Sequence, residues 1–406
     1  MLLLVSPVAS SLTSSEPPES PALPTSVVAL LAAGAGISAA NLYYNQPLLE
    51  GIARDLRVSP SAVALLPTAT QVGYATGLFL FAPLGDRLGL RRVIVTKGLA
   101  LAAALALAAA APSVASLAAA SFAIGLLATT AQDYVPAAAA LAPPEARGKV
   151  VGTAMTGLLL GILLSRVASG LVGGAFGWRT VYVGAAALVA GLTALARRNL
   201  PDIPPSAAGG TYGAMLGSMA DLVRRHPPLR RAAVAQAFLS LGFSAFWSTL
   251  ALVLARPPFH HGSAVAGAFG LAGAAGALAA PVAGSLADRR GPEAIVRTGA
   301  LLAAGSFLAM ALGGGSLVVL AVATITFDLG VHAALVSHQT IVYGLEPAAR
   351  SRSNAVLMTA MFIGMALGSA IASRILEPWG GRGIALLAAG SALVAFVVRV
   401  LPARRQ

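Results

Sequence analysis

Long apolar stretches separated by short polar segments run through almost the whole chain. Twelve of them contain about 20 residues or more, which is enough for an α-helix to cross the ~30 Å hydrocarbon core of a bilayer. The pattern predicts spans at 26–50, 62–84, 93–112, 114–142, 149–175, 178–197, 230–256, 263–287, 294–313, 316–345, 352–377 and 383–401. Before them, residues 1–25 are rich in Ser, Pro and Glu and predict a disordered tail.

A segment near residue 86 recurs near residue 288. Residues 82–89 (APLGDRLG) align with residues 284–291 (GSLADRRG) at an offset of 202 residues, and the SAVA of 61–64 recurs at 263–266. Two similar apolar halves are typical of transporters built from parallel repeats. We therefore expect an all-α membrane protein with twelve transmembrane helices in two pseudo-symmetric six-helix bundles. The bundles are predicted at 26–197 and 230–401, joined by a linker at 198–229 and followed by a short tail at 402–406.

Basic residues gather on one side of the predicted spans. If both termini are cytoplasmic, the cytoplasmic segments hold 20 basic residues and the outer segments hold six. The positive-inside rule therefore predicts cytoplasmic termini, tails and linker. Within the linker, Asp221–Arg225 alternates apolar and basic residues and predicts a short interfacial helix.

Composition narrows the function further. Hydrophobic residues make up 57% of the chain and charged residues 10%, which is typical of a membrane protein. The net charge of +13 lies in short loops and does not indicate a nucleic-acid partner. Cysteine is absent, and no phosphate-binding loop or Ser-His-Asp set is evident. The lack of these motifs predicts no enzyme activity, and we expect no cofactor. His260 and His261 lack a nearby carboxylate, so we expect no metal site there.

The loop after the second predicted helix resembles the signature of the major facilitator superfamily, and the loop at 284–291 repeats it. Asn41–Leu49 (NLYYNQPLL) and Gly177-Trp178-Arg179 resemble a bacterial efflux branch of that superfamily. The chain departs from the common pattern at Leu90, where a basic residue is usual, and in the fifth helix, which lacks the proline of many drug antiporters. The resemblance implies that charged loop residues latch the cytoplasmic gate. These are Asp86, Arg87, Arg147, Asp288, Arg289 and Arg350.

Asp133 and Arg166 are charged residues inside predicted spans. Such residues cost ~2.5–3.5 kcal/mol each at the bilayer centre and should face the protein interior with a partner. Two interpretations stay open. The residues form a structural ion pair between the fourth and fifth helices, or they border the central cavity. In the second case Arg166 holds an anionic substrate group or tunes protonation of Asp133.

The tenth predicted helix carries a polar stripe. Asp328 and His332 are four residues apart and therefore neighbours on one face, which continues to Gln339 and Tyr343. A carboxylate beside an imidazole can hold and release a proton, so we predict proton coupling at this pair, with Asp133 as a second candidate. The alternative is a stripe satisfied by neighbouring serines and backbone groups. His338 lies off the stripe and is expected to serve packing.

The resemblance implies that the first, fourth, seventh and tenth helices line a central cavity. Polar residues on the first and seventh helices, with Gln71 on the second, are therefore expected to contact substrate, although some will simply link helices. The expected contacts are Asn41, Tyr44, Asn45, Gln71, Arg166, Ser244, Trp247 and Gln339. Glycines such as Gly157, Gly161, Gly270, Gly273, Gly364 and Gly368 are expected to serve helix packing.

These expectations favour a monomeric secondary transporter of the bacterial inner membrane that exports a small amphipathic molecule in a proton-coupled cycle. The first alternative is proton-coupled or facilitated uptake of a sugar or organic acid. The second is a membrane receptor that transports nothing.

Overall fold

The computed structural model describes residues 23–81, 84–204, 212–273, 289–313, 315–346 and 349–401, and these residues form helices without strands. The predicted tails therefore lie almost entirely outside the described residues. The first half contains α1 (Thr25–Ala40), η1 (Gln46–Leu48), α2 (Leu49–Leu56), α3 (Pro60–Val63), α4 (Leu65–Phe81), α5 (Leu84–Leu88), α6 (Leu90–Ala109), α7 (Val114–Ala128), α8 (Ala131–Leu141), α9 (Arg147–Phe176) and α10 (Trp178–Asn199).

The predicted linker contains α11 (Tyr212–Arg225), so the segment 221–225 is helical, while its interfacial position stays a prediction. The second half contains α12 (Pro227–Leu254), a helix at Ser263–Gly273, α14 (Pro292–Gly313), α15 (Leu317–Tyr343) and α16 (Arg350–Val400). The long α16 consists of two helices joined at Gly380, whose φ of 56° and ψ of −156° are not helical. This break lies between the predicted spans 352–377 and 383–401.

Nine helices of the described part are long and apolar enough to cross a membrane, and α1 and the helix at 263–273 are shorter apolar helices. Large apolar side chains also cover the outside of the molecule. Leu160, Leu164 and Leu171 on α9 are each about half exposed. An outer surface of this kind suits contact with lipid and not with water. The multi-pass membrane character is thus confirmed, while the count of twelve spans stays a prediction.

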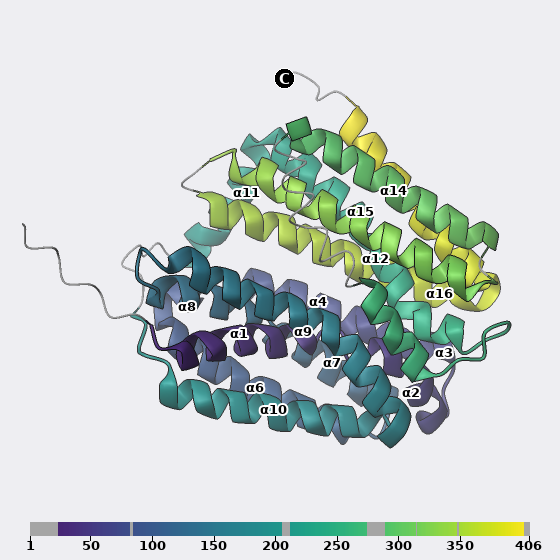
Figure 1. Ribbon diagram of the computed structural model, residues 1–406, viewed down its shortest axis with the longest axis horizontal. Helices are drawn as coiled ribbons and strands as arrows, with labels where there is room; N and C mark the ends of the chain where they lie inside the picture. The colour runs from purple at the N-terminus through teal and green to yellow at the C-terminus, as the bar shows by residue number, and fades with distance from the viewer. Residues whose placement is uncertain are drawn as a thin grey trace, which may run out of the picture.

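The two halves lie against each other as two groups of helices, α1–α10 in one and α11–α16 in the other (Figure 1). The same pairings recur in both. Helix α1 packs on α9 as α12 packs on α16, and α6 packs on α10 as α14 packs on α16. Recurrent pairings are expected when one half is a duplicate of the other.

Glycines make the closest of these pairings possible. A Cβ atom on Gly161 would lie 2.1 Å from the backbone oxygen of Gly36, and one on Gly364 would lie 2.0 Å from the backbone oxygen of Ala237. Only residues without a side chain allow backbones to approach this closely. The expected packing role of these glycines is confirmed.

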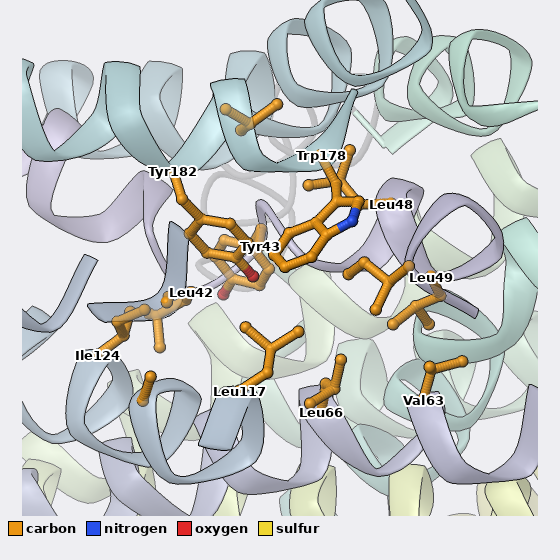
Figure 2. Close-up of a cluster of buried hydrophobic side chains, with 14 of the residues drawn as sticks. Leu42, Tyr43, Leu48, Leu49, Val63, Leu66, Leu117, Ile124, Trp178 and Tyr182 are labelled. Carbon is orange, nitrogen blue, oxygen red and sulfur yellow. The ribbon is translucent and has the colours of Figure 1, made fainter. Parts of the chain in front are cut away.

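Buried apolar residues form clusters inside each half and one cluster that joins the halves. In the joining cluster the rings of Tyr74 on α4 and Phe362 on α16 lie 4.3 Å apart. Figure 2 shows the part of this cluster around Tyr43, where Trp178 and Tyr182 of α10 approach the segment from Leu42 to Leu49. This packing holds the end of the first helix against the rest of its half.

Candidate functional site

A buried arginine lies between aromatic rings from both halves. The guanidinium carbon of Arg166, on α9, lies 4.4 Å from the ring centre of Tyr43 and 4.3 Å from that of Trp247 on α12. Arg166 is only 4% exposed. A cation over two ring faces is stabilised by the quadrupoles of the rings, and more strongly where water is excluded. Tyr43 and Trp247 therefore make a favourable place for this charge at the contact between the halves.

The hydrogen-bonding capacity of this arginine is only partly used. Its Nε donates to Oε1 of Gln46 at 2.8 Å. Nη2 of Arg166 and Nε2 of Gln46 are both buried and have no hydrogen-bond partner within the described part of the chain. Buried donors without partners are costly, so two adjacent ones indicate a place for a ligand atom that accepts hydrogen bonds.

Tyr43 and Gln46 reach the arginine because the first helix is interrupted. Helix α1 ends at Ala40, turns follow over residues 41–45, and η1 begins at Gln46. Within the break, Nδ2 of Asn41 donates to the backbone oxygen of Ile37 at 2.7 Å. Side chains that bond to the nearby backbone compete with regular helix, and Pro47 cannot donate to a helical hydrogen bond.

The interruption corrects one expectation. Asn41, Tyr44 and Asn45 do not share one face of a continuous helix. Asn45 donates from Nδ2 to the hydroxyl of Thr70 on α4 at 2.9 Å, and Tyr44 is half-buried. The side chains that face Arg166 from this segment are Tyr43 and Gln46, which sequence reasoning did not select because it assumed regular helical spacing.

The predicted acid and imidazole of α15 do lie together. Nδ1 of His332 lies 3.2 Å from Oδ2 of Asp328 and 2.9 Å from the backbone oxygen of the same residue. Both oxygens are acceptors, so Nδ1 carries a proton. The side chain of Asp328 is 2% exposed and that of His332 is 29% exposed. The imidazole is therefore the more exposed member of the pair, and the carboxylate is enclosed.

Trp247 connects this pair with the arginine. Its indole Nε1 donates to Oδ1 of Asp328 at 3.3 Å, while the ring covers the Arg166 guanidinium. Asp328 also interacts electrostatically with Arg166. Because both carboxylate oxygens of Asp328 already face Trp247 and His332, the acid and the arginine are joined through the indole.

The other residues predicted to contact substrate lie outside the group formed by Arg166, Trp247 and Asp328. Gln71 of α4 and Ser244 of α12 exchange hydrogen bonds of 2.9 and 3.1 Å across the two halves. Gln339 donates to Asn354 of α16 at 3.3 Å. Tyr343 is exposed at the end of the stripe. The stripe of α15 thus contributes its first two members to the site.

Two glycines of the helix at 263–273 border the site. A Cβ atom on Gly270 would lie 3.0 Å from Cβ of Arg166. One on Gly273 would lie 3.2 Å from the Trp247 ring and 3.8 Å from Oδ1 of Asp328. These residues were expected only to pack helices. They also leave the space that the arginine and the indole occupy.

Asp133 lies elsewhere and has a different partner from the one expected. Its Oδ2 accepts from Nζ of Lys97 on α6 at 2.6 Å, and the two side chains are 12% and 7% exposed. The expected pair of Asp133 with Arg166 does not form. Lys97 was counted with the cytoplasmic loop charges, although it falls inside the predicted span 93–112. Its place inside that span was the signal that could have marked it as a buried charge in need of a partner.

His338 confirms its expected packing role and adds a polar contact. It is fully buried, and its Nδ1 lies 2.9 Å from Oε1 of Gln236 on α12. Gln236 in turn donates to Ser240 at 3.2 Å.

The predicted gating residues are only partly described. Arg87, Arg147 and Arg289 are exposed. Asp288 and the side chains of Asp86 and Arg350 lie outside the described residues. Among the residues that the structure does describe, no group of three or more His, Cys, Asp or Glu side chains could hold a metal ion.

The site contains the positive charge of Arg166, N–H donors without a partner among the described residues, and the Asp328–His332 pair, which can exchange a proton. These are the parts that a carrier needs to bind an organic molecule and to respond to protons. They come from both halves, so relative movement of the halves would alter them.

Comparison with known proteins agrees with this geometry. The chain matches the Major Facilitator Superfamily over residues 31–331 and 232–406. It is 40% identical over 376 residues to the uncharacterized transporter YgaY of Escherichia coli O157:H7, covering 93% of this chain and 95% of that one. It is 37% identical over 360 residues to a protein of Streptomyces coelicolor named as a probable transporter, covering 88% and 83%.

Solved structures share the fold at low identity. The nucleoside transporter NupG, in a D323A mutant, has a TM-score of 0.77 at 14% identity, covering 92% of this chain and 98% of that one. An inward-open structure of the xylose transporter XylE from E. coli has a TM-score of 0.72 at 13% identity, covering 92% and 95%. At these identities the likeness shows the fold alone.

Fold, site and relatives lead to one assignment. The chain is a multi-pass membrane transporter and not an enzyme, and it belongs to the major facilitator superfamily.

Proposed function

We propose that this chain is a proton-coupled secondary transporter of the bacterial inner membrane that exports a small amphipathic organic molecule by alternating access. The observation that carries the proposal is the Asp328–His332 pair at the contact between the halves, joined through Trp247 to Arg166. The resemblance of Asn41–Leu49 to an efflux branch supports the outward direction. The distribution of basic residues supports cytoplasmic termini, and we expect a monomer.

Proton coupling requires a group that is charged in one state and neutral in the other. The Asp328 carboxylate is buried, and His332, which is more exposed, can pass a proton to it. Water reaching the pair from one side at a time would load and unload this proton in different conformations. The pair is therefore the proposed titrating element of the cycle.

Substrate binding is proposed between Arg166, Trp247, Gln71 and Ser244. The rings of Tyr43, Trp247 and Phe243 supply apolar walls, while the amide and the guanidinium supply polar contacts. Asn41 and Asn45 bond within the first half, so their proposed role is to hold the turn that presents Tyr43 and Gln46.

We further propose that the charged loop residues form the cytoplasmic latch. The support is the recurrence of Asp86-Arg87 at Asp288-Arg289. Asp86→Ala should block transport while leaving substrate affinity nearly unchanged. Loss of affinity with normal interconversion of states would contradict a latch.

The test begins with a ligand-stabilisation screen of the purified protein. A compound that raises the melting temperature is then followed in proteoliposomes with an imposed pH gradient. If substrate is exported in exchange for protons, the substrate should accumulate on the acidic side of the membrane. Transport that does not change with the pH gradient would refute proton coupling.

A second candidate is uptake of an organic acid together with protons. The two unpartnered donors at Arg166 and Gln46 favour it, because a carboxylate would satisfy both. An anion at Arg166 would be repelled by ionised Asp328, so it would bind more tightly as the pH falls and would move in the same direction as the proton. Exchange requires the opposite, namely weaker substrate binding as the pH falls. Affinity measured against pH, with no gradient, therefore separates the two candidates.

A further inference from the structure

Three side chains on three different helices form a continuous chain of contacts across the two halves. Asp328 on α15 accepts from the Trp247 indole, and the face of the same indole covers Arg166 of α9. Trp247 is thus in direct contact with the proton pair of one half and with the buried cation of the other. At 2% exposure it has no contact with bulk water that could replace either interaction.

The two interactions of Trp247 depend on each other. The hydrogen bond from Nε1 fixes the rotation of the indole, and a cation–π contact requires the ring face and not its edge to point at the guanidinium. Hydrogen bonds to a charged acceptor are about twice as strong as neutral ones. Neutralising Asp328 therefore weakens the contact that orients the ring over Arg166.

Among the residues that the structure describes, the bond to Asp328 is the one hydrogen bond of this indole. Phe246 meets the ring edge-on at 5.4 Å, and Phe243 lies 6.2 Å from it and 5.9 Å from the ring of His332. Gly273 lies against the indole with no side chain of its own. Within the described part of the chain, Arg166 and Tyr43 are the other charged or titratable groups that interact with the pair, and the helix at 263–273 contains none.

We propose that Trp247 is the residue that couples the protonation state of the Asp328–His332 pair to the contact between the halves at Arg166. With Asp328 ionised, the indole is held over Arg166 and the halves stay joined there. With the acid neutral, the indole is released and the contact at Arg166 loosens. Trp247 is in this sense a positioning residue for energy coupling, and the inference rests on the proposed proton-coupled transport.

The chain contains a matched control. Trp178 has the same chemistry, since its Nε1 donates to Asp55 at 3.0 Å and its ring lies 4.2 Å from the guanidinium carbon of Arg179. All of these residues belong to the first half, so the contact spans no boundary between halves. Removing this indole changes the same kinds of interactions without touching the proposed link.

The transport test compares Trp247→Phe with Trp178→Phe in proteoliposomes. Phenylalanine keeps a ring face for Arg166 and removes the N–H donor. Because Trp247 also lines the proposed substrate site, Trp247→Phe is judged by the ratio of pH-driven accumulation to counterflow. This ratio should fall by about tenfold, as expected for one lost hydrogen bond to a charged group, whatever the effect on ligand affinity. Trp178→Phe should leave all three unchanged. Equal loss of affinity, counterflow and accumulation in Trp247→Phe would make Trp247 an ordinary substrate contact and overturn the proposal.

A spectroscopic test does not need transport. The chain has three tryptophans, so the Trp178→Phe/Trp379→Phe variant reports on Trp247 alone. Its emission should change as the pH falls from about 8 to about 5, the range in which an ordinary imidazole gains a proton. Adding Asp328→Asn should abolish the change. A flat profile in the parent variant would overturn the link even if transport is pH-driven. A titrating profile in a protein that ignores pH gradients would instead refute the proposed function and keep the link.

Discussion

Asp133 and Asp328, the two buried acids among the described residues of this transporter, have opposite surroundings. Asp133 lies inside the first half, in direct contact with the amine of Lys97, and both side chains are almost fully enclosed. Asp328 lies where the halves meet, with a more exposed imidazole on one side and the Trp247 indole on the other. Asp133 is paired directly with the positive charge of Lys97. Asp328 has no such direct pair, and the positive charge linked to it through Trp247 is Arg166 of the opposite half.

The difference indicates which acid can take part in transport. A buried carboxylate paired with an amine is expensive to neutralise, because the lysine charge would remain alone in an apolar interior. The partner of Asp328 is an imidazole that can itself gain or lose a proton, and in the proposed alternating-access cycle movement of the halves would change what faces it. A closed pair inside one rigid half suits structure. A pair at the contact between the halves suits the proposed coupling, because any relative movement of the halves would change its surroundings.

The largest expected effect comes from neutralising Asp328. Asp328→Asn should abolish pH-driven transport and keep substrate counterflow, which needs no net movement of protons. Uptake and exchange assays in proteoliposomes measure both.

The matched control for Asp328→Asn is Lys97→Met/Asp133→Leu, which removes the other buried pair without leaving a charge behind. It should keep the response to the gradient. If the double variant loses pH-driven transport while Asp328→Asn keeps it, the roles of the two acids are reversed.

The second effect concerns stability. Lys97→Met alone leaves Asp133 buried without a counter-charge, which costs ~3–5 kcal/mol. The double variant should recover most of this loss, because an apolar pair of similar volume is often neutral or stabilising. Melting temperatures in detergent should therefore fall steeply in the single variant and far less in the double variant. Equal melting temperatures for the single variant and the wild type would show that the pair is not closed.

Sequence alone predicted the fold well, because long apolar runs and the recurrence at 86 and 288 do not depend on which helices touch. It also predicted the contact of Asp328 with His332, since spacing within one helix fixes which residues are neighbours. It failed for Asp133, whose partner lies on another helix. A sequence does not state which helix faces meet, so the proximity of Lys97 could not be derived.

The break in the first helix limited the rest of the site prediction. Regular spacing selected Asn41, Tyr44 and Asn45, whereas the turns after Ala40 rotate Tyr43 and Gln46 toward Arg166. Side-chain hydrogen bonds to the backbone, such as that of Asn41 to Ile37, favour this turn over a continuous helix. The two backbone conformations differ little in free energy, so the sequence alone does not decide between them.

A third and smaller effect tests how tightly the pair between the halves is held. Gly273→Ala would place a methyl group 3.2 Å from the Trp247 ring, and overpacking of this kind costs about 1–3 kcal/mol. We expect a lower melting temperature and weaker pH-driven accumulation. Gly305→Ala on α14 is the control, because its Cβ would have no neighbour within 4 Å among the described residues. Identical behaviour of the two variants would mean that the space around the indole does not matter.

The smallest expected effect comes from Asp55, a surface acid that serves as a reference for the two buried ones. It lies in α2, beyond the predicted membrane-spanning part of the first helix, and its side chain is 47% exposed. Hydrogen bonds from Arg179 and then from Trp178 hold the pKa of this carboxyl below its usual value. A lowered pKa in the folded state contributes stability above the unfolded pKa of ~3.9, and that stability is lost as the pH falls through the folded value. Asp55→Asn should therefore reduce stability at pH 7 by roughly 0.2–1 kcal/mol, the range of exposed ion pairs, and the difference should vanish in strong acid. Melting temperatures at neutral and acidic pH measure this.

Because Asp55 already carries its charge throughout the neutral range, Asp55→Asn should leave pH-driven transport unchanged. A changed transport profile would mean that proton coupling is not confined to the pair between the halves.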